Sequence, residues 1–387
     1  MREGWESMRL TNFVWFQRGF DLPRNNFVEG NVPVYGSTSI LGYHNVSKVK
    51  APGIITGRSG TLGKFQFANE DFWPHNTSLW VKDFKDNDEK FAYYLLQTLD
   101  FTLFNSGGAV PTLNRNLLTA YIVNIPPLET QRKIASILSG YDDLIENNLK
   151  RIKILEEMAQ QTYEEWFVRM RFPGYETAVM NEETGLPEGW EKVKLGKLWE
   201  IQSSKRIYLS DYVEFGIPFF RGKEISQKGG NSNVSDLLYI SEFKFNELKS
   251  KFGAPKEGDI LLTAVGTLGN LYMVKQTDDE FYFKDGNLIW LKFNSTYSSY
   301  FLFYTLKNSS FQNHLNNIAI GSSQKALTIK GLKESEIIYP SNEIIMDFDR
   351  ITKPINLSIE NFQSQNQRFR EARDLLLPRL MMGIVEV

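Results

Sequence analysis

Residues 134–166, IASILSGYDDLIENNLKRIKILEEMAQQTYEEW, carry the pattern that decides the fold. Apolar side chains recur there at alternating steps of four and three residues, which is typical of a coiled-coil seam. The seam positions are Ile134, Leu138, Tyr141, Ile145, Ile152, Leu155, Ala159 and Trp166. A second stripe lies near the end of the chain, at Phe348, Ile355, Ile359, Phe362, Phe369, Leu376 and Leu380. Two matching helices in one chain predict an antiparallel pair that forms a rod between two globular domains.

Each predicted helix also contains residues that disturb the pattern. Asn148 and Asn366 occupy stripe positions. A polar residue there either sets the register at some cost in stability, or lies at a frayed edge that faces water. Gly140 and Pro354 occupy equivalent positions and are poor residues for a helix interior. We therefore expect a kink or a break there, which would leave a short helix before each long one.

The two stripes belong to a chain that repeats itself. Gly4-Trp5-Glu6 recurs as Gly189-Trp190-Glu191 at an offset of 185, and Gly60-Thr61-Leu62-Gly63 recurs as Gly266-Thr267-Leu268-Gly269 at an offset of 206. Ile145-Glu146-Asn147 recurs as Ile359-Glu360-Asn361 at an offset of 214. The second copy therefore holds 21 extra residues between Pro218 and its Gly-Thr-Leu-Gly turn, an insertion that we expect in a surface loop.

The first part of each copy reads as short strands and turns. Runs such as 53–56 and 259–262 are rich in β-branched and aliphatic residues and are bounded by Gly, Asn or Pro. A helical stretch follows at 91–99 and again at 300–306. The expected fold class is α+β: two α/β domains at residues 1–125 and 188–339, and helical regions at 126–175 and 340–387. The tandem duplication predicts pseudo-two-fold symmetry.

Composition excludes several classes of protein. The 387 residues are too many for one ordinary core, and 42% hydrophobic residues suffice to fill two. Because the chain has no cysteine, it has no disulfide, thiolate nucleophile, zinc finger or iron–sulfur cluster. No run approaches the roughly 18 apolar residues of a membrane span. The start, MREGWESMRL, lacks the apolar stretch of a signal peptide. We expect a soluble, cytoplasmic protein.

Catalytic and metal-binding motifs are absent from the sequence. Its three histidines show no metal-ligand spacing, and His75 reads as a turn or core residue. Residues 57–64, GRSGTLGK, fail as a phosphate-binding loop, because five residues separate Gly57 from Gly63 and Phe65 follows Lys64. Residues 124–128, NIPPL, resemble the adenine-methyltransferase signature but carry an extra isoleucine and lack its aromatic residue. No metal site or catalytic residue is predicted.

Charge is distributed unevenly along the chain. Residues 1–125 hold 12 basic and 11 acidic residues, and residues 188–340 hold 19 and 17, which leaves 13 and 18 for the helical remainder. Acidic helices favour contact with protein over contact with phosphates. The turn that carries Arg58, Ser59, Thr61 and Lys64 could approach phosphates closely, or it could be a plain hairpin turn.

Several motifs resemble those of one family. Residues 126–135, PPLETQRKIA, with 145–147, IEN, 166–169, WFVR, and Phe172-Pro173, resemble the central conserved region of type I restriction-modification specificity subunits. Residues 375–383, LLLPRLMMG, resemble the end of their distal conserved region, and 186–191, LPEGWE, the entry to a target recognition domain. The likeness covers nearly the whole chain. It departs at residues 341–345, SNEII, which replace a Pro-Leu-Glu-x-Gln pattern.

The resemblance implies a non-catalytic subunit that binds double-stranded DNA. Each target recognition domain would read one half of a bipartite site, and the helices would act as a spacer ruler of roughly 50 Å. The helices would also dock methylation subunits, two by analogy, and restriction subunits would join them. The resemblance implies no cofactor in this chain, with S-adenosylmethionine, ATP and magnesium held by those partners, and no membrane.

The resemblance also suggests where DNA contacts lie, in equivalent loops of the two copies. Arginine and lysine suit guanine edges or phosphates, and asparagine and glutamine suit adenine edges. In the first domain the candidates are Tyr35, Ser37, Thr38, Arg58, Ser59, Thr61, Lys64, Asn76, Thr77, Thr112, Asn114 and Arg115. In the second they are Arg221, Lys223, Thr263, Thr267, Lys284, Asn287, Ser322, Ser323, Gln324 and Lys325.

Two other functions fit parts of the sequence. A DNA-modifying enzyme would need the cofactor and catalytic motifs that this chain lacks. A duplicated coiled-coil scaffold, whose globular domains bind protein or carbohydrate, would have no DNA specificity even with methylation subunits present.

Overall fold

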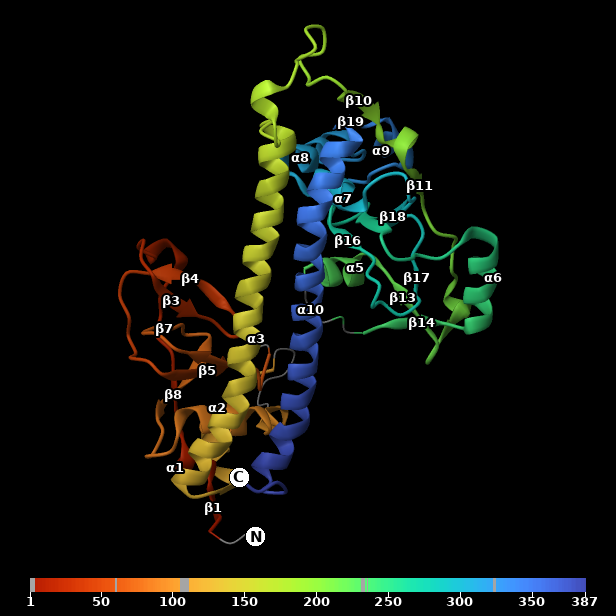
Figure 1. Ribbon diagram of the computed structural model, residues 1–387. Coiled ribbons are helices and arrows are strands. Elements are labelled where there is room, and N and C mark those ends of the chain that lie inside the picture. Colours follow the sequence, from red (N-terminus) through yellow and green to blue (C-terminus); the bar gives the residue numbers. More distant parts are fainter. Residues whose placement is uncertain (1–3, 60, 105–110, 231–233, 235, 323–324) are drawn as a thin grey trace. The chain divides into compact units, whose positions relative to one another are not determined.

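A computed structural model describes residues 4–59, 61–104, 111–230, 234, 236–322 and 325–387 (Figure 1). The chain forms two compact units. Unit 1 comprises Met1–Asn147 and Gln365–Val387, and unit 2 comprises Asn148–Ser364. Each unit therefore combines one globular region with parts of both long helices.

Unit 1 is built on a four-stranded antiparallel sheet and a smaller sheet. The first has the strand order β2 (Trp15–Arg18), β8 (Ser78–Asp83), β5 (Gly53–Gly57), β6 (Phe65–Ala68), and the second has the order β4 (Ile40–His44), β3 (Val32–Tyr35), β7 (Trp73–Pro74). Strand β1 (Glu6–Arg9) pairs with β9 (Ile122–Ile125), and helices α1 (Leu10–Phe13) and α2 (Glu89–Gln97) complete the unit. Every residue of β5 is buried, as the run of β-branched residues in it predicts.

Unit 2 repeats this topology with one additional strand, β12, at the edge of its second sheet. Its sheets have the orders β11 (Glu200–Gln202), β18 (Leu288–Lys292), β15 (Ile260–Thr263), β16 (Leu271–Met273), and β12 (Tyr212–Val213), β14 (Leu238–Ile240), β13 (Ile217–Phe220), β17 (Tyr282–Phe283). Strand β10 (Glu191–Lys194) pairs with β19 (Glu336–Tyr339). The registers also correspond, because Ile55 faces Trp80 in one unit and Leu261 faces Trp290 in the other. The predicted duplication is confirmed.

The insertion in the second copy is more than a surface loop. Helices α5 (Gly222–Gly229) and α6 (Glu242–Phe252) lie between β13 and β15, whereas only β4 lies between β3 and β5. Ile225 of α5 is buried against Leu261 and Trp290. The expectation of a surface loop was wrong, since the extra residues supply apolar side chains to the core.

The remaining elements are short helices and turns. Unit 2 contains α4 (Leu195–Leu198), α7 (Ser299–Lys307), α8 (Ser309–Ile318) and α9 (Ile329–Glu334). Helices α2 and α7 match the predicted helical stretches, and each is capped by a side chain, Asp88 or Ser298. Short 3-10 helices lie at Arg24–Asn26, Phe101–Phe104, Arg115–Ala120, Tyr175–Thr177 and Leu209–Asp211, and a π-helical turn at Glu164–Val168.

The two long helices, α3 (Leu128–Tyr163) and α10 (Asn342–Met381), pack antiparallel within each unit. In unit 1 the rings of Tyr141 and Phe369 lie 6.3 Å apart. In unit 2 the Arg151 guanidinium lies 5.5 Å from the Phe362 ring. The Tyr163 ring lies 6.2 Å from that of Phe348. Because partners in α10 fall in number as those in α3 rise, the predicted antiparallel seam is confirmed.

Neither long helix is broken. Helix α3 runs through Gly140 and α10 runs through Pro354, so the predicted short preceding helices were wrong. Buried seam residues such as Leu138 and Phe348 hold the turns before these positions. Near Pro354, the Thr352 hydroxyl donates to the Phe348 carbonyl at 2.9 Å, and the Asn356 amide donates to the Thr352 carbonyl at 2.8 Å. Packing thus overrides the low helix propensity of these residues.

The seam asparagines are inside the molecule. Asn148 is 5% exposed and Asn366 is 1% exposed, and the Asn366 amide donates to the Ile145 carbonyl at 3.4 Å. The water-facing alternative was therefore wrong. Buried amides at these positions support a role in setting the register of the helices.

Candidate nucleic-acid interface

Equivalent hairpin turns lie at the centre of the candidate site in each unit. The turn between β5 and β6 carries Arg58–Lys64, and the Thr56 hydroxyl closes it by donating to the Lys64 carbonyl at 2.9 Å. In the β15–β16 turn, the Thr263 hydroxyl donates to the Thr267 carbonyl at 2.5 Å. Gly63 and Gly269 both have positive φ angles, of 75° and 83°, that favour glycine. The hairpin structure is confirmed, and contact with DNA stays a prediction.

Two further predicted segments join each hairpin through equivalent backbone hydrogen bonds. In unit 1 the Arg58 amide donates to the Thr77 carbonyl at 3.0 Å, and the Leu113 amide donates to the Arg58 carbonyl at 2.8 Å. In unit 2 the Ala264 amide donates to the Asn287 carbonyl, and the Leu327 amide to the Ala264 carbonyl, both at 2.8 Å. The structure therefore brings together the segments that the sequence paired by analogy.

The fourth predicted segment borders the same surface. The Ser37 hydroxyl donates to the Thr77 carbonyl at 2.9 Å, and the His75 amide donates to the Tyr35 carbonyl at 2.8 Å. In unit 2 the Lys284 amide makes the corresponding bond to the Phe220 carbonyl, next to Arg221. His75 also contacts the Thr77 hydroxyl through Nδ1 at 3.0 Å, so the prediction of a turn residue is confirmed.

The basic residues of the site differ in their availability. Within the part of the chain that the structure describes, no ion pair involves Arg58, Lys64, Arg115, Lys284 or Lys325. Arg221 is instead bound to the buried Glu224 carboxylate, with Nη2 2.5 Å from Oε1, and this hydrogen bonding raises the pKa of Arg221. Lys223 lies 3.6 Å from Asp236. The unpaired cations are the better candidates for phosphate or base contacts.

Several predicted contact residues have structural roles. Tyr35 and Thr263 are buried, so their side chains do not face a ligand in this structure. The Asn76 amide binds the Asp21 carboxylate, and Asn114 caps the Arg115–Ala120 helix by accepting from the Asn116 amide at 3.0 Å. Exposed or partly exposed positions are Ser37, Thr38, Ser59, Thr61, Thr77, Thr112, Thr267, Asn287 and Ser322. Ser323 and Gln324 lie outside the described residues.

Sequence reasoning missed one segment of the surface, which lies at the end of β2 and just after β11. In unit 1 the Arg18 guanidinium donates through Nε to the Asn76 carbonyl at 3.4 Å. In unit 2 Arg206 Nε lies 3.3 Å from Asp285, and the Ser204 hydroxyl donates to the Phe283 carbonyl at 2.7 Å. The offset of 185, which carries Gln17 to Gln202, was the signal that could have placed both segments.

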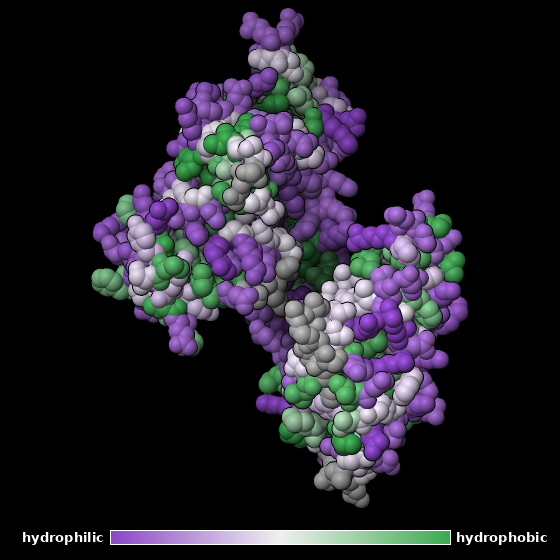
Figure 2. Space-filling view, turned by 180° about the vertical axis from the view of Figure 1, so that it is seen from behind, coloured by the Kyte–Doolittle hydropathy of each residue, from purple (hydrophilic) through white to green (hydrophobic). Residues whose placement is uncertain are grey.

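The described residues outside these loops form neither a metal-ligand cluster nor a membrane-spanning helix. Figure 2 shows hydrophilic and hydrophobic residues interspersed over the visible face. Among the described residues, no group of His, Asp and Glu could hold a metal ion. No helix in the described ranges is long and apolar enough to cross a membrane.

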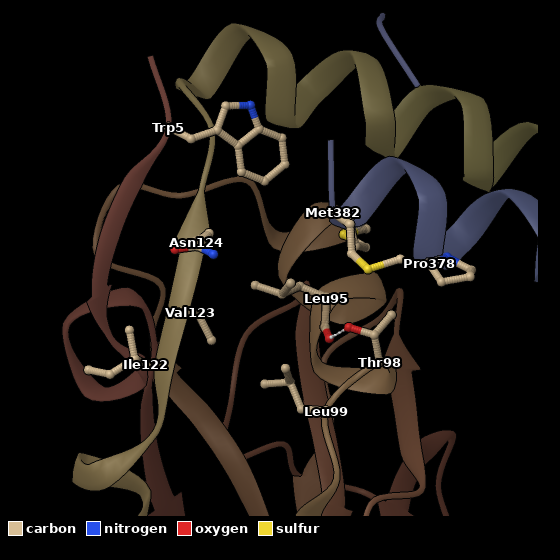
Figure 3. Close-up of a pocket in the computed structure, with 10 residues that line it drawn as sticks. Trp5, Leu95, Thr98, Leu99, Ile122, Val123, Asn124, Pro378 and Met382 are labelled. Atoms are coloured by element: carbon tan, nitrogen blue, oxygen red, sulfur yellow. Dashed lines mark hydrogen bonds between the residues drawn. The ribbon is translucent and has the colours of Figure 1, made fainter. Parts of the chain in front are cut away.

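A cavity of about 390 Å³ in unit 1 lies apart from the hairpin turn. Figure 3 shows Trp5, Val123 of β9, Leu95 and Leu99 around it, with Pro378 and Met382 from the end of the chain. The Thr98 hydroxyl donates a hydrogen bond to the Leu95 carbonyl at 2.7 Å. The lining is largely apolar and holds no charged side chain, so it supplies no acid, base or nucleophile.

Comparison with known proteins agrees with this geometry. The family model for the type I restriction modification DNA specificity domain matches residues 2–157 and again residues 187–363. The MjaIX specificity subunit of Methanocaldococcus jannaschii is 28% identical over 310 residues, which cover 77% of this chain and 69% of that protein. The MjaVIII specificity subunit of the same organism is 25% identical over 406 residues, and the match covers 100% of this chain and 94% of that protein.

A solved structure shares the fold. The crystal structure of the type I restriction-modification S subunit from M. genitalium has a TM-score of 0.63 and 17% sequence identity, and the match covers 97% of this chain and 96% of that one. The double match of the family model corresponds to the two copies found in the sequence and to the repeated topology of the two units. The chain therefore belongs to the type I restriction-modification DNA specificity family.

Proposed function

We propose that this chain is the DNA-reading subunit of a type I restriction-modification complex. Its two globular regions, residues 1–125 and 188–339, each read one half of a bipartite site. The observation that carries the proposal is the convergence of equivalent segments around Arg58 in one unit and Ala264 in the other. Two surfaces of the same design and different side chains suit the reading of two different half-sites.

The contacts fall into two kinds. Arg58, Lys64, Arg115, Lys284 and Lys325 supply positive charge to phosphates or guanine edges. Exposed hydroxyl and amide side chains in the same loops, including Thr61, Thr112 and Asn287, supply hydrogen bonds to base edges. Because a protein reads sequence through base edges and fixes its position through phosphates, both kinds are needed for specificity.

The long helices serve as the spacer between the two readers. Helix α3 has 36 residues and α10 has 40, which correspond to lengths of about 54 and 60 Å. A length of this order spans more than one turn of DNA, which is about 34 Å. Together α3 and α10 hold 11 basic and 12 acidic residues, so they carry no positive charge that would attract phosphates, and we assign them the docking of two methylation subunits.

The reactions belong to the partners. The chain itself performs no catalysis and holds no cofactor. Methylation subunits supply S-adenosylmethionine, and restriction subunits supply the ATP- and magnesium-dependent steps. Among the described residues, no group of His, Asp and Glu could hold a metal ion, which is compatible with this division of labour.

The test is co-expression with the methylation subunit from the same source, followed by single-molecule sequencing for N6-methyladenine. Methylation at a split motif on both strands is the expected result, and it gives the target directly. Equal methylation without this chain, or no stable complex between the two proteins, contradicts the proposal and favours the scaffold function.

A further inference from the structure

In unit 1 a charged joint connects the globular region to both long helices. The Tyr94 hydroxyl of α2 donates to Oδ2 of Asp142 in α3 at 2.5 Å. Arg373 of α10 donates through Nη1 to Oδ1 of the same carboxylate at 2.5 Å. One side chain of α3 therefore ties together three helices, and each of its oxygens has its own donor.

The joint leads directly to the candidate DNA surface. Helix α2 packs on β5 and β6, the strands that carry the Arg58–Lys64 turn. The Phe67 ring of β6 lies 5.4 Å from the Tyr93 ring of α2, and the Lys90 ammonium lies 5.0 Å from the same phenylalanine ring. Close packing of this kind transmits a displacement of one element to the next. The angle of α2 on α3 and α10 therefore fixes the position of the turn relative to those helices.

Unit 2 has a different joint at the equivalent place. Tyr304 of α7 corresponds to Tyr94, and Asn356 corresponds to Asp142. The Asn356 amide donates to the Tyr304 hydroxyl at 3.0 Å. The position that corresponds to Arg373 is Ala159, which is fully buried. At this place the ion pair is thus a feature of unit 1, added to a tyrosine hydrogen bond that both units have, to a carboxylate in unit 1 and to an amide in unit 2.

Partial burial strengthens the hydrogen bonds of the joint, so they hold the three helices in one geometry. Tyr94 is 2% exposed, and its burial, followed by its hydrogen bond to Asp142, raises the pKa of Tyr94. The Arg373 and Asp142 side chains are 27% and 31% exposed, so water screens their attraction only in part. Apolar contacts between α3 and the domain tolerate small rotations, whereas charge-assisted hydrogen bonds hold one geometry.

We propose that Asp142 and Arg373 are positioning residues, which hold the first domain at one angle on α3 and α10 and so restrict the DNA spacer that the protein accepts. This inference rests on the proposed function. It differs from that function in assigning spacer selection to a joint, in addition to helix length.

The test transplants the neutral joint of unit 2 into unit 1. The double variant Asp142→Asn with Arg373→Ala reproduces the Asn356 and Ala159 arrangement. The matched control, Asp143→Asn with Arg368→Ala, changes the same charges at exposed positions of the same two helices. Each variant is co-expressed with the methylation subunit, and single-molecule sequencing gives the distribution of spacer lengths among methylated sites.

We expect the wild type and the control to methylate sites of one spacer length. In the joint variant, methylation at spacers one base pair longer or shorter should rise about tenfold, a difference of about 1.4 kcal/mol, with unchanged half-sites. Tyr94→Phe, which keeps the ring and removes only the hydroxyl, should act in the same direction and guards against a joint variant that fails to fold.

The outcomes separate the two claims. Suppose that the wild type methylates sites of one spacer length, and that the folded joint variant and Tyr94→Phe keep the same spacer length. That result overturns the positioning role and leaves the proposed function intact. A wild type that directs no bipartite methylation contradicts the proposed function and, with it, the positioning role.

Discussion

Gly19 shows how a single residue fixes the candidate surface. A Cβ atom at this position would lie 2.1 Å from the His75 carbonyl oxygen, because the chain after β2 runs against the turn that precedes β8. The Gly19 amide also donates to the Ser78 carbonyl at 3.0 Å, which holds the two segments together. Only glycine permits this approach of backbone to backbone.

The variant Gly19→Ala should therefore destabilise unit 1, by about 2–3 kcal/mol, since backbone atoms must move apart to admit the methyl group. Gly140→Ala is the matched control, because its Cβ would meet nothing within 4 Å and it lies inside α3. That substitution should stabilise the protein by about 1 kcal/mol. Urea unfolding of the two variants gives both values, and equal effects would contradict the account.

Arg58 and Lys64 should affect DNA binding without affecting stability. Replacing both by alanine removes two unpaired cations from the β5–β6 turn, so affinity for the methylated site should fall about tenfold or more and the salt dependence should weaken. Lys82→Ala is the control, since Lys82 lies near the end of β8 remote from the turn. A loss of affinity as large for Lys82→Ala would argue against a defined surface.

The sequence predicted the segments of the site better than the individual side chains. Repeated glycine turns at regular offsets located the loops around Arg58 and Ala264. Such turns are visible in the sequence because their backbone conformations favour glycine. Thr263 and Tyr35 are buried, which the sequence did not reveal, since a hydroxyl that closes a turn or points inward looks the same in sequence. The pairing of Arg221 with Glu224 depends on the fold of the inserted helix α5.

At the scale of elements, the seam of the long helices should dominate stability. Ile152 is 3% exposed and Ile154 is 56% exposed, and both belong to α3. Ile152→Ala should lower the free energy of unfolding by about 2–4 kcal/mol, because it leaves a cavity in a packed seam. Ile154→Ala should change it by less than about 0.5 kcal/mol. Circular dichroism during urea unfolding measures both, and similar losses would contradict the assignment of the seam.

The elements also show where pattern reasoning fails. The four-and-three periodicity predicted both long helices and their antiparallel pairing, since a seam depends on side-chain spacing alone. Propensity predicted breaks at Gly140 and Pro354 that do not occur, because packing of neighbours such as Leu138 and Phe348 outweighs the cost of one poor residue. The core role of α5 was invisible because a length difference does not reveal what the extra residues contact.

At the scale of the whole molecule, the two domains should act independently. Exchanging residues 1–125 for the corresponding domain of another family member should change one half of the methylated motif and leave the other half unchanged. The reason is that the reading loops of each unit are held by hydrogen bonds within that unit. Sequencing of N6-methyladenine reports both halves at once, and a change in both would show that the domains are not separate readers.

In the proposed function the paired helices set the distance between the two readers, and a deletion of one heptad from each helix tests this role. Removing Ile145–Arg151 together with Ile359–Gln365 takes one heptad from each helix where the two units meet along the chain. The stripe stays in phase, and each helix shortens by about 10 Å. In cells that also express the methylation subunit, methylated sites should keep both half-sites and show a shorter spacer. An unchanged spacer in a folded, active variant would contradict this role.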